Sequence, residues 1–203
     1  YAVLSDPQEA AGKISPTLAY VLSALIATGL AYYHWFYEGW RENIIFAASI
    51  TAALVAALTL ISRRLLMSIA TVAAVVAMIV VAADVKRRYI EMVLHAYDVV
   101  FYLTSWATIR FLWVDHRAYL IAIIVSFLLT TLLARVLYVW DSTRISRVLS
   151  GGLLVIFSCL AMWASYAKGE RRNTLFYWDN LYLSSFYASW SETMETLMKG
   201  QLL

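Results

Sequence analysis

The sequence has few of the residues from which catalytic and metal-binding sites are built. Its 203 residues include one cysteine, Cys159, three histidines and two prolines, and charged residues make up only 14% of the chain. A single cysteine excludes an internal disulfide and any metal cluster held by cysteines. The sequence also lacks a glycine-rich phosphate loop, a Ser-His-Asp arrangement and a Cys-x-x-Cys motif. The chain therefore offers little chemistry of its own, and we expect no catalytic residue, metal or cofactor within it.

Hydrophobic residues, by contrast, make up 63% of the chain. Because a typical soluble domain has about 25% charged and about half apolar residues, this composition predicts an integral membrane protein. The net charge is only +3, and the basic residues cluster at the ends of apolar segments. This pattern argues against nucleic acid as a partner and for phospholipids and the membrane.

Five apolar segments are each long enough to cross about 30 Å of hydrocarbon as a helix. The sequence therefore predicts an all-α, polytopic membrane protein. The expected spans are residues 14–37, 44–62, 65–83, 118–140 and 148–167. Only Arg63-Arg64 separates the second span from the third, so these two must form a tight antiparallel hairpin.

The segment 98–114 is expected to lie at the interface or to be re-entrant. It is interrupted by Arg110 and is rich in aromatic residues such as Trp106 and Trp113. Aromatic rings of this kind favour the membrane–water interface, where one part of the ring is in contact with water.

The stretch 173–203 is predicted to form an amphipathic helix that lies on the bilayer and begins at Asp179 or Asn180 as a cap. Apolar and polar residues recur at helical spacing on opposite sides of it. The apolar set is Leu183, Phe186, Tyr187, Trp190, Met194, Leu197 and Met198, and the polar set includes Ser185, Ser189, Glu192, Glu195 and Lys199.

Three consecutive cations, Lys86, Arg87 and Arg88, follow the third expected span. Cations beside hydrocarbon attract anionic head groups, so they are candidate ligands of a phospholipid phosphate. The alternative is ordinary snorkelling of cations at a helix end. Asp98 either orients one of these cations or caps the helix that follows.

Arg171 and Arg172 follow the fifth expected span and fall on the same side as the triplet, because two crossings separate them. They are candidates for completing a basic rim around the head group. The alternative is that they mark the membrane edge.

The remaining polar residues favour simpler interpretations. His34, His95 and His116 all fall on one side of the membrane, where haem ligation is conceivable, but histidines at helix ends are far commoner. Glu38 and its charged neighbours Arg41 and Glu42 are expected to form a solvated loop.

The residues after the third span resemble a motif of the lipoteichoic acid synthase-like proteins, which are sulfatase-fold phosphoglycerol and phosphoethanolamine transferases of the alkaline phosphatase superfamily. In that family a lysine-led stretch precedes a Gly-x-Pro-Leu turn and an aspartate that starts an apolar segment. Lys86 matches the lysine, Leu94 the leucine and Asp98 the aspartate, whereas Glu91-Met92-Val93 replaces Gly-x-Pro. The stretch from Phe176 to Leu203 is similar to the family's juxtamembrane linker helix.

The resemblance implies that this chain anchors the enzyme and presents its lipid substrate. A catalytic threonine and divalent metal ions would then lie in a catalytic domain beyond Leu203, because both ends of the sequence look cut. The resemblance also implies a bacterial plasma (inner) membrane location with a cytoplasmic N-terminus and an extracytoplasmic C-terminus. Counting basic residues by the positive-inside rule favours the reverse orientation.

Two other functions compete with this one. The chain is alternatively an accessory or assembly subunit of a larger membrane complex, with membrane-protein partners and no catalysis. A small transporter or channel is the third hypothesis, but its spans should contain ionisable residues or be broken by glycine and proline. The second, third and fifth spans contain no charged residue, which argues against transport.

Overall fold

The computed structural model describes residues 13–102, 105–167 and 181–199, and all their regular secondary structure is helical. Five of these helices are long and apolar enough to cross a membrane, which confirms the expected fold class. The helices are α2 (Pro16–Tyr37), α3 (Arg41–Ser62), α4 (Leu65–Ile90), α5 (Trp106–Asp115), α6 (Arg117–Trp140), α7 (Arg147–Ala167) and α8 (Tyr182–Lys199), with a π-helical turn η1 at Asp98–Tyr102.

The spans end close to where the sequence predicts, with one exception. Helix α4 was expected to stop at Ala83 but continues to Ile90, so the basic triplet lies inside its last two turns. The expected boundary was wrong because lysine and arginine are good helix formers and a helix does not end where its side chains become polar. The helix ends instead at Glu91, whose φ of 60° turns the backbone into the left-handed conformation.

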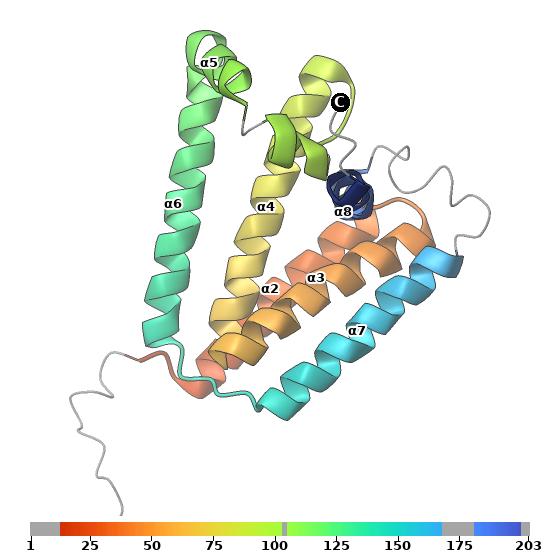
Figure 1. Cartoon of the computed structure of the whole chain (residues 1–203). Helices are drawn as coiled ribbons and strands as arrows, with labels where there is room; N and C mark the ends of the chain where they lie inside the picture. The colour runs from red at the N-terminus through yellow and green to blue at the C-terminus, as the bar shows by residue number, and fades with distance from the viewer. Residues whose placement is uncertain (1–12, 103–104, 168–180, 200–203) are drawn as a thin grey trace, which may run out of the picture.

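The long helices define two faces of the molecule (Figure 1). The hairpin face carries the α3–α4 turn at Arg63 and Arg64 and the connection from α6 to α7. The α8 face carries the ends of α2, α4 and α7, together with α5 and α8. This arrangement agrees with five crossings, in which the basic triplet and α8 share one face.

Packing among the spans is uneven. Helix α7 lies along α3, whereas α4 contacts α2, α3 and α6. Helix α6 packs on α4 and α5 at one edge of the bundle (Figure 1). None of its described side chains is buried. Large apolar side chains therefore cover the outside of the bundle, as expected for surfaces that face lipid.

The hairpin face is held by a remote helix cap. The buried carboxylate of Asp141, at the end of α6, accepts a hydrogen bond from the backbone N–H of Met67 at 3.0 Å. The hydroxyl of Thr143 accepts another from the N–H of Leu65 at 2.9 Å. These two N–H groups belong to the first turn of α4, where no intrahelical acceptor exists. The α6–α7 connection therefore fixes the start of α4.

Within its described residues, the segment 98–114 contributes no helix long enough to cross the membrane. Its described helices are η1 and α5, and the ten residues of α5 rise only about 15 Å, half the thickness of the hydrocarbon core. Both parts lie on the α8 face (Figure 1).

Helix α8 differs from the expected surface helix. Every residue from Leu183 to Ser189 is buried, including the serines predicted to face water, because this half of α8 packs against both α3 and α4. Its second half fits the expectation better, since Met194, Leu197 and Met198 are exposed. The expected caps Asp179 and Asn180 lie outside the described residues.

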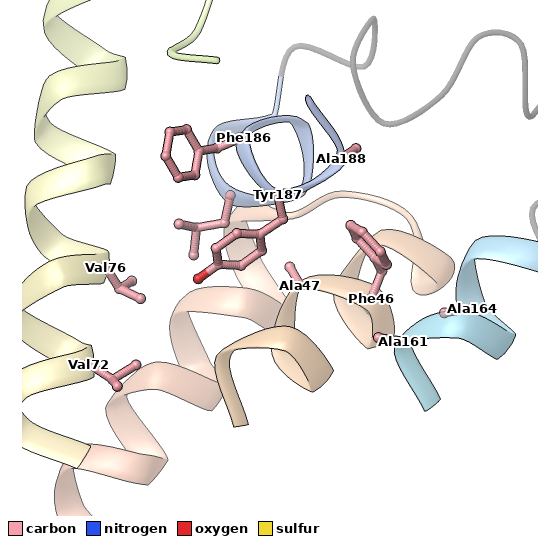
Figure 2. Close-up of a cluster of buried hydrophobic side chains, with 10 residues drawn as sticks. Phe46, Ala47, Val72, Val76, Ala161, Ala164, Phe186, Tyr187 and Ala188 are labelled. Atoms are coloured by element: carbon pink, nitrogen blue, oxygen red, sulfur yellow. The ribbon is translucent and has the colours of Figure 1, made fainter. Parts of the chain in front are cut away.

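The main hydrophobic core lies where α8 meets the spans (Figure 2). Tyr187 of α8 lies between Val72 and Val76 of α4 on one side and Phe46 and Ala47 of α3 on the other. The amphipathic helix is thus part of the core rather than an appendage to it.

The left-handed residue at the end of α4 gives a first prediction. Glycine adopts this conformation without steric cost, whereas a side chain costs roughly 1 kcal/mol or more. We expect Glu91→Gly to be more stable to heating in detergent than Glu91→Ala by about 1 kcal/mol. Because both variants remove the carboxylate, their difference isolates the backbone, and equal stabilities would contradict the assigned turn.

Candidate functional site

The candidate site is formed by the basic end of α4. Cations suit this position, because the last carbonyl groups of a helix have no intrahelical donor and carry partial negative charge. Successive residues of a helix point about 100° apart, so Lys86, Arg87 and Arg88 cannot all face one ligand. The structure gives each of them a different environment.

The side chain of Lys86 lies against the turn that follows α4, where Asp98 neutralises its charge. Its Nζ lies 2.6 Å from Oδ2 of Asp98, with the side chains 17% and 13% exposed, and 5.7 Å from the centre of the Tyr97 ring. The same carboxylate oxygen accepts the backbone N–H of His95 at 2.7 Å. Asp98 therefore fulfils both roles that the sequence left open: it pairs with a cation and caps the turn into η1.

Arg87 is exposed and reaches α8. It donates a hydrogen bond to the hydroxyl of Tyr182 at 3.3 Å, and its guanidinium carbon lies 5.8 Å from the centre of that ring. The Tyr182 hydroxyl in turn donates to Asp84 at 3.4 Å. The first residue of α8 is therefore bound directly to the basic end of α4.

Arg88 has the most accessible charge of the three. Its guanidinium lies 2.7 Å from Asp84 one turn earlier, but its side chain is 76% exposed. Such surface pairs contribute only about 0–1 kcal/mol, so an anionic ligand can compete for the arginine. Arg87 and Arg88 thus form an exposed pair of guanidinium groups, separate from the buried Lys86–Asp98 pair.

A buried carboxylate that sequence reasoning missed positions α8. Glu38, which was expected in a solvated loop, is fully buried. Its two carboxylate oxygens accept the backbone N–H groups of Leu183 and Ser184, each at 2.9 Å. The expectation was wrong because the partners lie 145 residues away in sequence, and the first amides of a helix attract a carboxylate strongly.

The local chain around Glu38 permits this approach. Gly39 has a φ of 70°, and the side chain of Leu181 lies 3.4 Å from where its Cβ would stand. A larger residue would be strained in this conformation. The only sign of this contact in the sequence is a glutamate followed by a glycine between two helices. This sign does not identify α8 as the helix that Glu38 caps.

A second buried contact links α8 to the interior of the bundle. The hydroxyl of Thr51 lies 3.1 Å from Nε2 of His34 and 3.2 Å from the hydroxyl of Tyr187. Nδ1 of His34 lies 2.6 Å from the carbonyl oxygen of Leu30. Both ring nitrogens of His34 are therefore occupied by protein oxygens, which does not suit a haem ligand. Burial raises the pKa of Tyr187 to about 12.

A third contact joins α8 to the turn that holds Asp98. The hydroxyl of Ser189 accepts the backbone N–H of Ala96 at 2.7 Å. The Lys86–Asp98 pair, the exposed arginines and α8 consequently form one connected unit on the α8 face.

The other predicted residues do not enter this unit. Arg171 and Arg172 lie outside the described residues. Within the described ranges, no group of three histidine, cysteine, aspartate or glutamate side chains is arranged to hold a metal ion.

The chain matches no family model, no curated protein and no solved structure. Functional inference therefore rests on the geometry and on the resemblance in sequence.

The Glu38 contact predicts how firmly α8 is docked. Ser184 is fully buried, so a Ser184→Cys variant lacking Cys159 should react slowly with a thiol reagent. Adding Glu38→Ala leaves two amides without their charged acceptor, a loss of about 2 kcal/mol or more. We expect the labelling rate to rise at least about tenfold.

Glu42→Ala is the matched control for this experiment, because it removes a neighbouring carboxylate that has no hydrogen bond or ion pair with the described residues of α8. It should leave the labelling rate unchanged. If Glu38→Ala and Glu42→Ala behave alike, Glu38 does not hold α8.

Proposed function

We propose that this chain is the membrane domain of a sulfatase-like phosphotransferase, the family that its sequence resembles. It binds the phosphate of a phospholipid at the basic end of α4 and presents the head group for transfer to an envelope glycan or lipid acceptor. Its location would be a bacterial plasma membrane, with α8 on the extracytoplasmic side. Catalysis and the divalent metal ions would belong to a domain that follows Leu203.

The observation that carries this proposal is the exposed pair of arginines beside α8. Arg87 and Arg88 have planar guanidinium groups that can each offer two parallel N–H donors to phosphate oxygens. Their present partners are a hydroxyl and a half-exposed carboxylate, Asp84, which a more highly charged phosphate can displace. A lipid at the membrane surface can approach both groups from the solvent.

The Lys86–Asp98 pair gives the motif a positioning role. Lys86 and Asp98 are two of the three residues that carry the resemblance in sequence, and they are in direct contact at 2.6 Å. The contact holds the turn after α4 against its helix, which keeps Arg87 and Arg88 at the edge of the unit. Glu91 replaces the family's glycine, yet it adopts the positive φ that glycine adopts most readily.

The position of α8 supports its role as a connector. Its first residue, Tyr182, contacts Arg87, and its buried half is fixed by Glu38 and Ser189. A domain attached after α8 would therefore be held close to the bound head group. Proximity of this kind lowers the entropic cost of bringing two reactants together.

Substitution of the arginines tests head-group binding. The double variant Arg87→Gln/Arg88→Gln should weaken binding to phosphatidylglycerol vesicles by roughly 1 kcal/mol per charge, about thirtyfold in total. Binding would be measured as co-sedimentation of the purified protein, with phosphatidylcholine vesicles for comparison. Unchanged binding to phosphatidylglycerol would reduce the arginines to markers of the membrane edge.

Lys86→Gln distinguishes positioning from binding. It leaves Asp98, whose side chain is only 13% exposed, without its cation, so we expect a loss of thermal stability in detergent of about 2 kcal/mol. Replacing both partners, as in Lys86→Met/Asp98→Leu, should restore part of that loss while leaving Arg87 and Arg88 in place. If Lys86→Gln lowers the affinity for the head group and Arg87→Gln/Arg88→Gln does not, this division of roles is wrong.

A cysteine at Glu195 tests the orientation, because this residue is exposed and belongs to the polar set of α8. In a background without Cys159, Glu195→Cys should react with a membrane-impermeant thiol reagent added to intact cells. Labelling only after permeabilisation would reverse the proposed topology.

An accessory subunit of a membrane complex is the second candidate, and the exposure of α6 favours it. Large apolar residues cover α6, including Phe127, Leu128 and Leu129, and a partner helix could pack there. The full gene separates the two functions. A reading frame that continues beyond Leu203 into a domain with a threonine nucleophile and metal ligands supports the enzyme, whereas a stop codon supports the subunit.

A further inference from the structure

An apolar groove runs along α3, and its lining includes His34 and Thr51, which contact each other beneath α8. Its volume is about 620 Å³, and its walls come from α2, α3, α7 and the start of α4. The floor is made by the small residues Ala48, Ala52 and Ala56 of α3, with Ala31 of α2 and with Leu153 and Phe157 of α7 at its sides. The groove lies within the membrane-spanning helices, so whatever fills it enters from the bilayer.

The dimensions of the groove suit a hydrocarbon chain. Its lining extends along α3 from Ile44 to Thr59, a rise of about 22 Å. One leaflet contributes about 15 Å, half of the hydrocarbon core, so the groove can hold a lipid acyl chain along its length. The alanines on its floor let such a chain approach the backbone of α3 closely.

The groove reaches the hairpin face at a cluster of arginines. Arg63 ends α3 one turn after the lining residue Thr59, and Arg144 and Arg147 flank the lining residue Ile145. The backbone N–H of Ile145 donates to the carbonyl of Arg63 at 3.1 Å, which holds the two connections together. The backbones of the three arginines therefore lie close to this end of the groove, which is called its mouth below.

These arginines have no acidic partner within the part of the chain that the structure describes. All three are exposed, and none forms an ion pair there. Asp141 is fully buried, and its carboxylate accepts hydrogen bonds from Met67 and Thr143. The positive charge of these three arginines is therefore available to bind an anion that is not part of the described chain.

We propose that the groove and the arginine cluster together bind an anionic phospholipid of the leaflet at the hairpin face. The acyl chain occupies the groove, and Arg63, Arg144 and Arg147 bind the phosphate. Basic pockets between transmembrane helices recognise anionic head groups in this way. The site lies on the opposite face from Arg87 and Arg88 and does not depend on the proposed function.

An anionic lipid accounts for both the apolar groove and the arginine cluster, whereas free phosphate accounts for the arginines alone. Inorganic phosphate would bind the arginines and leave the apolar groove without a role. A zwitterionic lipid would fill the groove without satisfying the excess of positive charge. The combination of an apolar channel and unpaired cations at one end matches the amphipathic form of an anionic lipid.

Photocrosslinking of the purified full chain in detergent tests this site. The probe is phosphatidylglycerol with a diazirine on its acyl chain, and mass spectrometry maps the attached peptides. We expect crosslinks on α3 and α7, and competition by unlabelled phosphatidylglycerol at concentrations at least about tenfold below those required of phosphatidylcholine or inorganic phosphate.

Three variants separate the head group from the chain. Arg63→Gln/Arg144→Gln/Arg147→Gln should weaken probe binding roughly a hundredfold, about fivefold per arginine. Ala52→Phe fills the floor of the groove and should lower crosslinking on α3 and α7 while leaving the arginines intact. Arg87→Gln/Arg88→Gln, on the opposite face, should leave these crosslinks unchanged.

The outcomes distinguish this site from the proposed function. Crosslinks on α3 and α7 that disappear with the Arg63 triple variant but persist in the Arg87 double variant support the hairpin-face site, whatever the chain's activity. Equal competition by phosphatidylcholine would overturn the role of the arginines. Competition by inorganic phosphate as strong as that by lipid, or labelling unaffected by Ala52→Phe, would overturn the role of the groove.

Discussion

The contact between the carboxylate of Glu38 and the amino end of α8 is the constraint on which the α8 face depends. It brings together residues 145 positions apart and satisfies two helix amides and a buried charge at once. A buried carboxylate without such donors would cost several kcal/mol. With α8 fixed there, Tyr182 lies beside Arg87, Ser189 beside Ala96 and Tyr187 beside Thr51. The contacts of α8 with the basic end of α4 and with the core therefore depend on one helix cap.

A helix cap supplied by a distant carboxylate also holds the hairpin face. Asp141 caps α4 from the α6–α7 connection, and the Lys86–Asp98 pair fixes the other end of the same helix. Helix α4 is thus restrained at both membrane surfaces, while α6 and α7 each lie along one neighbouring span. A central helix with both ends tethered suits the proposed role of holding a lipid in a defined position.

The proposed lipid sites bear on why the count of basic residues opposes the proposed orientation. The positive-inside rule assumes that cations serve mainly to orient the chain during insertion. If Arg87 and Arg88 bind a head group on one face and Arg63, Arg144 and Arg147 bind another on the opposite face, cations are retained on both sides for function. Their distribution then reflects ligand binding as well as topology.

The sequence by itself determined the five spans and the short segment between α4 and α6, because crossing hydrocarbon demands long uncharged helices wherever they pack. It also identified Lys86 and Asp98 as candidate site residues. It did not reveal that α4 continues through the basic triplet, that Glu38 is buried, or that Leu183 to Ser189 lie within the core. Only the tertiary structure decided these features, since a polar residue is buried or exposed according to partners that distant segments bring to it.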